Sequence, residues 1–155
     1  MVYEDYPSIN TPINSERLNK SCITAYPEVL ENLETDLIPM QHAIVQGNKF
    51  SLVDGGIKIG ASVSMVELSA QIWYYANGST SQWFTLMKNN MPINTILTFA
   101  TEYNSVSFAP LLLNVVEGDV ITMHITSRVG SESLNINTGH GMSDAIPTYI
   151  TIKEI

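Results

Sequence analysis

The clearest pattern in this chain is an alternation of apolar and polar side chains over residues 64–76, SMVELSAQIWYYA. Successive side chains of a β-strand point to opposite faces of a sheet, so the alternation predicts one long strand with a single buried face. The residues predicted to face the core are Val66, Leu68, Ala70, Ile72 and Tyr74.

Similar patterns continue to the end of the sequence. Residues 82–100, QWFTLMKNNMPINTILTFA, are typical of two strands that turn at Asn89 and Asn90, because Asn tolerates a positive φ. Further strands are predicted at residues 105–115, 120–129 and 147–155, with a tight turn at Glu117–Asp119. Roughly eight to ten strands at short spacing, without interleaved helices, predict an antiparallel sandwich or barrel.

The chain before Gly47 carries a different pattern. Leu30, Leu33 and Leu37 stand at helical spacing among acidic residues, and Pro39 ends the pattern, which predicts a short amphipathic helix. This helix either lies on the surface of its own domain or forms a neck in which the leucines of several copies meet.

A still shorter helix is predicted to begin near Asn14 or Ser15, which are good capping residues. Residues 1–46 have too little apolar surface for a core of their own, so we expect an extended or helical arm that packs on partners. The sequence therefore predicts an attachment arm with short helices at residues 1–46 and a β-domain at residues 47–155.

Composition narrows the class of protein. A chain of 155 residues with 45% hydrophobic content suffices for one domain with one core. The net charge of −8, without a basic stripe, argues against nucleic-acid binding. The start MVYEDYP carries acids where a signal peptide needs Lys or Arg, and the most apolar run, LLLNVV, is much shorter than the roughly 20 residues that span a bilayer. We therefore expect neither a signal peptide nor membrane insertion.

Four segments together carry a family resemblance: FSLVDGGIKIGASVSMVELSAQI, LMKNNMPI, LLLNVVEGDVITMHI and the closing TYITIKEI. In their order and spacing they resemble the ten-stranded jelly roll of the C1q/TNF-like superfamily, as it occurs in phage fibre-tip domains. The resemblance covers about two-thirds of the chain and implies an all-β, antiparallel jelly-roll sandwich preceded by the short helical or extended arm. Its most recognisable part is the turn at Gly118 and Asp119 that leads into a long apolar strand.

The segment TPINSERLNK, residues 11–20, carries a second resemblance. It is similar to a segment of the form T-P-[IL]-N-A-E-N-L-N near the N-terminus of many tail-fibre and related virion proteins of phages that infect Firmicutes. Ser15 and Arg17 stand where Ala and Asn are usual. The residues that match this attachment segment are Thr11, Pro12, Ile13, Asn14, Glu16, Leu18 and Asn19.

The residue types needed for catalysis are present but not in productive spacings. His42, His124 and His140 form none of the spacings that bring two ligands to one metal. His124 reads as an ordinary strand residue or as one that meets its copies on a symmetry axis. His140, between glycines, reads as a loop tip or a ligand contact. We predict no catalytic residue, cofactor or metal, and no enzyme activity.

Two further sets of residues leave alternatives open. The single cysteine, Cys22, is predicted on a helix without a nearby histidine, so it indicates neither a disulfide nor a nucleophile. Glu117, Asp119 and Asp144 include the residue types of an acid–base pair, but nothing in the sequence brings them together. Glu117 and Asp119 read as solvated turn residues, with a calcium site as the alternative.

Aromatic residues crowd around the sequence ANGSTSQ at residues 76–82. Aromatic rings pack in subunit interfaces and also bind the faces of sugar rings. The side chains proposed for such an interface or ligand patch are Trp73, Tyr75 and Trp83.

Together these observations predict a bacteriophage virion structural protein, made in the host cytoplasm and displayed on the virion surface. Its N-terminus would bind other virion proteins, and its jelly-roll head would face outward as a tail-fibre tip or a capsid head fibre. Host-surface polysaccharide or protein is the expected external partner. The alternative is a stand-alone lectin or carbohydrate-active enzyme on a jelly roll, since a fold does not fix a function.

The jelly-roll resemblance also implies a homotrimer with the final strand near its axis. Low charge supports this prediction, because only 14% of residues are charged and residues 93–115 contain one charged side chain, Glu102. The alternate positions of these strands carry Thr, Ser and Asn, which can meet their hydrogen bonds inside a partly dry interface.

Overall fold

The computed structural model describes residues 20–76, 80–100, 102–130, 134–137 and 147–155, and for Ala100 the backbone only. The attachment segment at residues 11–19, the helix predicted near Asn14, and His140 and Asp144 lie outside the described residues. All elements of the described chain are β-strands, and every strand pairing is antiparallel.

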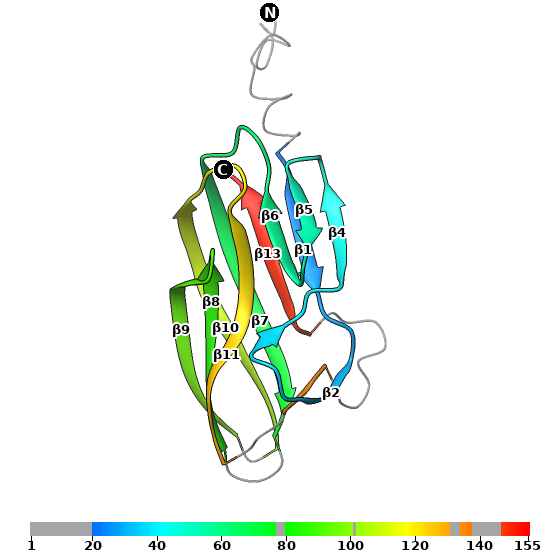
Figure 1. Ribbon diagram of the computed structural model, residues 1–155, viewed down its shortest axis with the longest axis vertical. Coiled ribbons are helices and arrows are strands. Elements are labelled where there is room, and N and C mark those ends of the chain that lie inside the picture. The colour runs from blue at the N-terminus through cyan, green and yellow to red at the C-terminus, as the bar shows by residue number, and fades with distance from the viewer. Residues whose placement is uncertain (1–19, 77–79, 101, 131–133, 138–146) are drawn as a thin grey trace, which may run out of the picture.

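Two sheets make up the structure (Figure 1). The β7 sheet has the order β2-β12-β7-β13-β1-β4, and β10 pairs with β7. Its strands are β1 (Cys22–Tyr26), β2 (Leu30–Leu33), β4 (His42–Gln46), β7 (Met65–Tyr75), β10 (Tyr103–Asn114), β12 (Leu134–Ile136) and β13 (Tyr149–Glu154).

The β11 sheet has the order β5-β6-β11-β8-β9, and β3 pairs with β11 beside β6. Its strands are β3 (Leu37–Ile38), β5 (Phe50–Val53), β6 (Gly56–Ile59), β8 (Thr80–Lys88), β9 (Met91–Ala100) and β11 (Val120–Val129).

The alternation in the sequence correctly predicts the buried face of β7. Its five even-numbered apolar residues, from Val66 to Tyr74, are at most 2% exposed and pack against the inward side chains of β11. The β11 contribution to this core is Ile121, Met123 and Ile125. Apolar area removed from water, at about 25 cal/mol per Å², is the main stabilising contribution to such a sandwich.

The helix predicted at Leu30–Leu37 is wrong, because this segment forms β2 and β3. The cause lies at Asn32, which has a φ of 53° and adds one extra residue to β2 opposite β12. Leu30 and Leu33 pair with Ile136 and Leu134 and both pack against the core. A bulge thus places side chains three apart on one face, which imitates helical spacing.

The separation of residues 1–46 from the β-domain is also wrong for the described part of that segment. β1 lies between β13 and the edge strand β4 within the β7 sheet, and Cys22 lies on this strand instead of a helix. Ser21 N–H donates to Glu154 Oε2 over 3.1 Å, and Lys49 Nζ lies 2.6 Å from Glu154 Oε1. The β-domain therefore includes residues 21–46, because their backbone and apolar side chains complete its sheets.

The predicted turns are confirmed. β8 and β9 join through Asn89 and Asn90, whose φ angles are 51° and 63°. Gly118, with a φ of 92°, lies in the turn that leads into β11. Asp54 and Gly55, with φ angles of 34° and 79°, make a second two-residue turn between β5 and β6.

Candidate functional site: a pocket on the outer face of the β11 sheet

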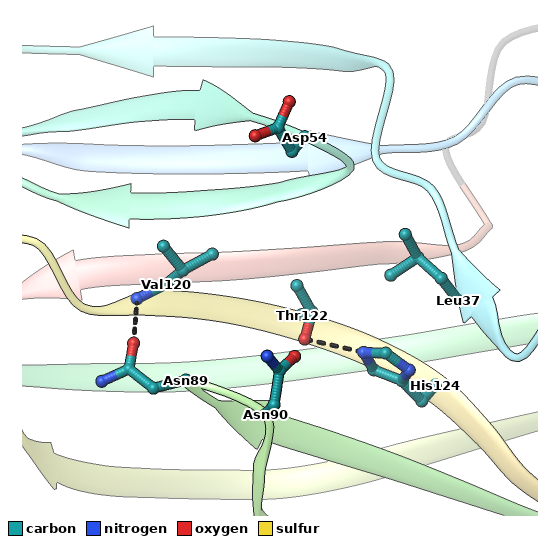
Figure 2. Close-up of a pocket in the computed structure, with 7 residues that line it drawn as sticks. All are labelled: Leu37, Asp54, Asn89, Asn90, Val120, Thr122 and His124. Carbon is teal, nitrogen blue, oxygen red and sulfur yellow. Dashed lines mark hydrogen bonds between the residues drawn. The ribbon is translucent and has the colours of Figure 1, made fainter.

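Two hairpin tips flank a depression on the outer face of the β11 sheet (Figure 2). Asp54 comes from the β5–β6 tip, and Asn89 and Asn90 come from the β8–β9 tip. Both tips are two-residue loops with positive φ at both positions, a backbone that Asp, Asn and Gly adopt at low cost. The tips hold their polar side chains at fixed places on either side of β11.

The floor of the depression is the outward face of β11. Val120, Thr122 and His124 alternate with the core residues of this strand, and Leu37 on β3 pairs with His124. The cavity measures about 400 Å³, within the range of small-molecule sites. We call it the β11 pocket, and its lining residues are Leu37, Asp54, Asn89, Asn90, Val120, Thr122 and His124.

Asn89 is held by hydrogen bonds that fix one wall of the β11 pocket. Its Nδ2 donates to Asp119 Oδ1 over 2.7 Å, and its Oδ1 accepts from Val120 N–H over 2.9 Å. Asp119 is 5% exposed, and its Oδ2 accepts from Val116 N–H over 3.0 Å. Lys88 Nζ lies 3.6 Å from the same Oδ2. This network ties the β8–β9 tip to the start of β11.

The environment of Asp119 keeps its carboxyl ionised. Burial by itself would raise the pKa of Asp119, but hydrogen bonds from Val116 and Asn89 and the charge of Lys88 outweigh it. The pKa therefore lies below its usual value, and the carboxylate acts as an acceptor at the centre of the turn.

Two other lining groups have unused hydrogen-bonding capacity. The Asp54 carboxylate and the Asn90 amide make no hydrogen bond or ion pair with another described residue, and both residues are exposed. Thr122 Oγ1 and His124 Nε2 share a hydrogen bond of 2.9 Å. Burial lowers the pKa of His124, and the charge of Asp36 only partly offsets this, so the ring is neutral at neutral pH.

The chemistry of the β11 pocket is therefore that of recognition. It offers a carboxylate, an amide, a hydroxyl and a neutral imidazole beside two apolar side chains. Among the described residues, no group of three or more His, Cys, Asp and Glu side chains is placed to hold a metal ion. In the same part of the chain, no helix is long and apolar enough to cross a membrane.

The structure separates the aromatic residues that the sequence groups together. Trp73 and Tyr75 lie on the outer face of the β7 sheet, where both rings contact Tyr103. The Trp73 ring stacks on Tyr103 with centroids 6.1 Å apart, and the Tyr75 ring is tilted against Tyr103 with centroids 4.9 Å apart. Trp83 lies on the outer face of the β11 sheet beside Leu97, its partner on β9. Since these faces are on opposite sides of the sandwich, the three residues do not form one patch within a single chain.

Sequence reasoning missed most of the β11 pocket. The sequence predicts a turn at Asn89 and Asn90, a strand residue or a symmetry-axis contact at His124, and a helix at Leu37. The dipeptides Asp54-Gly55 and Asn89-Asn90 do signal two tight hairpins in the sequence. Nothing in the sequence shows that the two tips lie on either side of β11, because that depends on the strand order.

Comparisons with known proteins support the fold. No protein-family profile and no curated protein matches this sequence. Among solved structures, that of murine APRIL at pH 5.0 aligns with a TM-score of 0.61 and 12% identity, covering 88% of this chain and 99% of that chain. The structure of Eiger TNF from S. frugiperda aligns with a TM-score of 0.60 and 11% identity, covering 88% and 93%.

At such low identity, these similarities establish the fold alone. The chain is an all-β, antiparallel jelly roll of the C1q/TNF-like kind, as its strand order and spacing predict.

Proposed function

We propose that this chain is a bacteriophage virion structural protein, a trimeric fibre or spike that exposes its jelly-roll head on the virion surface. The N-terminal segment TPINSERLN, residues 11–19, attaches it to other virion proteins, at a tail-fibre tip or as a capsid head fibre. Its fold and the resemblance of that segment to phage fibre proteins support this proposal. The observation that carries the proposal is the scarcity of charged side chains on the outer face of the β7 sheet.

The outer face of the β7 sheet is almost uncharged. Across β10, β7, β13, β1 and β4, the paired outward positions carry two charged side chains, Glu67 and Lys153. Lys153 Nζ lies 3.9 Å from Glu67 Oε1. Large apolar and aromatic side chains stand among them, including Leu112, Ile44 and Tyr103, whose ring stacks on Trp73. An exposed sheet face normally carries charge at alternate positions, so this face suits contact with other subunits.

The position of β13 fits the same assembly. β13 lies between β7 and β1 near the middle of this face, and its outward residues Tyr149 and Thr151 are only partly exposed (Figure 1). If three copies pack through the outer face of the β7 sheet, their β13 strands lie near the common axis. Each subunit then contacts both of the others, and the three contacts close the assembly as a ring.

The attachment arm would leave from one end of the head. Ser21 and Glu154 exchange two hydrogen bonds, Ser21 N–H to Glu154 Oε2 and Glu154 N–H to Ser21 O. Ser21 therefore lies at the end of the sandwich at which β13 finishes. In a trimer the three arms would start close to the axis, a suitable arrangement for docking on one site of a virion.

Light scattering tests the assembly. The intact protein at micromolar concentration should have three times the 17.1 kDa mass of one chain. Leu112→Glu, at a side chain 61% exposed on the proposed interface, should give monomers without unfolding the head. Phe99→Glu, at a side chain 69% exposed on β9 of the other sheet, is the matched control and should remain trimeric. A monomeric wild type, or a Leu112→Glu trimer, contradicts the proposed interface.

Deletion of residues 1–19 tests attachment. The shortened protein should still form trimers but should not be incorporated into phage particles, and antibody labelling of intact particles would distinguish tail from head. The second candidate function is a free-standing lectin on the same fold, which the β11 pocket favours. Incorporation into particles without residues 1–19 would contradict the attachment role of that segment, whereas absence of the full-length protein from particles would support the second candidate.

A further inference from the structure

The β11 pocket combines features that define a class of ligand. We infer that it binds a neutral saccharide, with Asp54 and Asn90 as the main hydrogen-bonding residues. The role of the pocket as a recognition site on a displayed head rests on the proposed function. Sugar binding itself can be tested on the isolated protein. The outer faces of the two sheets are on opposite sides, so trimer formation through the β7 sheet leaves the pocket accessible.

The hydrogen-bonding groups of the β11 pocket complement vicinal hydroxyls. The Asp54 carboxylate only accepts hydrogen bonds, whereas the Asn90 amide both donates and accepts, so together they suit neighbouring hydroxyls that do both. Neither side chain is bonded to another described residue, so a ligand need not break an existing contact. Thr122 and the neutral His124 ring add further polar atoms at the floor.

The apolar part of the lining suits the carbon face of a sugar ring. Leu37 and Val120 lie on either side of the polar floor, and a cavity of about 400 Å³ accommodates a short oligosaccharide (Figure 2). The lining contains no Trp, Tyr or Phe ring on which a sugar could stack. We therefore expect a dissociation constant of order 1 mM for one sugar unit, which three copies in a trimer would strengthen through multivalency.

Charge argues against the other ligand classes. The one charged lining side chain is the Asp54 carboxylate, and the whole chain carries a net charge of −8, so phosphates and acidic polymers are repelled. Two cations lie near the pocket but outside its lining. Lys88 is held at Asp119 and at the Asn114 carbonyl, and the exposed Lys58 lies on β6 opposite Val120. Ca²⁺ prefers six or more oxygen ligands, and the pocket offers a single carboxylate. We therefore do not expect the pocket to bind this cation.

The backbone of the hairpin tips allows clean substitutions. Asn90→Gly removes the amide at a φ of 63°, which Gly adopts freely, and Asp54→Asn removes the charge while keeping a residue that tolerates positive φ. Asn32→Gly is the matched control. Asn32 also has a positive φ and an exposed side chain, but it lies on β2, outside the pocket.

Amide-resolved NMR titration of the intact protein provides the test. The probes are the methyl glycosides of glucose, galactose and N-acetylglucosamine, with inorganic phosphate, glycerol 1-phosphate and CaCl₂ as charged comparators. At least one glycoside should shift the amide resonances of Asp54, Asn90 and His124, and Asn90→Gly and Asp54→Asn should each weaken binding at least about fivefold. Asn32→Gly should bind like the wild type.

Three results would overturn the inference. They are no shift at the pocket with any glycoside up to roughly 100 mM, sugar binding that neither pocket variant weakens, and tighter binding of a charged comparator than of any glycoside. The oligomeric state is measured separately in the same samples. A trimer that binds no sugar refutes this inference alone, and a monomer that binds sugar refutes the proposed assembly alone.

Discussion

Asp119 provides the sharpest test of how the β11 pocket is built. Its carboxylate accepts hydrogen bonds from Val116 N–H and from Asn89 Nδ2, and it lies beside Lys88. Asp119→Ala removes all three interactions at once at a residue only 5% exposed. We predict that this substitution loosens the β8–β9 tip and destabilises the whole sandwich.

The expected magnitude follows from these contacts. A hydrogen bond to a charged group contributes about 1.5–3 kcal/mol, with the lower end appropriate here because Val116 is exposed and its N–H can bind water. The partly exposed Lys88 adds less than about 1 kcal/mol. Asp119→Ala should therefore lower the free energy of unfolding by roughly 3 kcal/mol, or Tm by roughly 6–12 °C for a chain of this size.

The pH dependence has a defined direction. Because the pKa of Asp119 is lower in the folded than in the unfolded chain, its contribution is complete above the unfolded pKa and is lost as pH falls through the folded pKa. Asp119→Asn lacks this titration. The stability difference between wild type and Asp119→Asn should therefore be largest near neutral pH and should shrink in acid.

Urea unfolding from neutral to acidic pH, at one fixed protomer concentration, measures both effects. Glu117→Ala, an exposed position two residues earlier in the same turn, should cost less than about 0.5 kcal/mol and serves as control. The reasoning fails if Asp119→Ala costs no more than Glu117→Ala. It fails equally if the difference between wild type and Asp119→Asn stays constant into acid.

Two further predictions concern the same sheet. Asn89→Gly should lower the free energy of unfolding by about 1–3 kcal/mol, because it removes the side-chain hydrogen bonds to Asp119 and Val120. Asn90→Gly in the same turn should leave the free energy of unfolding nearly unchanged. Equal losses for the two variants in urea unfolding would contradict this account. Gly56→Ala should lower Tm measurably in a thermal scan, because an added Cβ would lie 2.6 Å from the Ile121 carbonyl oxygen, and an unchanged Tm would show that β6 can move away from β11.

The sequence predicts long strands well and short ones poorly. β7 is long enough for a period of two to be unambiguous, and its five inward residues are those that the alternation selects. β2 and β3 are four and two residues long, and the bulge at Asn32 gives Leu30 and Leu33 a helical spacing. Local pattern cannot separate a bulged strand from a helix over so few residues.

The extent of the β-domain depended on pairing between distant residues. β1 carries a short alternation that does not identify its partner strands. Its pairing with β13 joins residues more than a hundred positions apart. The boundary predicted near Gly47 rests on a change in the period of the hydrophobic pattern from 3.6 to 2 residues. Sheet membership follows long-range backbone hydrogen bonds, which a local period does not report.

By itself, the sequence determined the all-β class, the long strands, the tight turns and the scarcity of charge, because each depends on neighbouring residues. Only the tertiary structure decided which side chains meet. Strand order places Trp73 and Trp83 on opposite faces, and it brings Asp54 and Asn90, from two separate hairpins, to one pocket over β11. The physical reason is that a turn is set by its own backbone, whereas a site is set by the packing of strands distant in the chain.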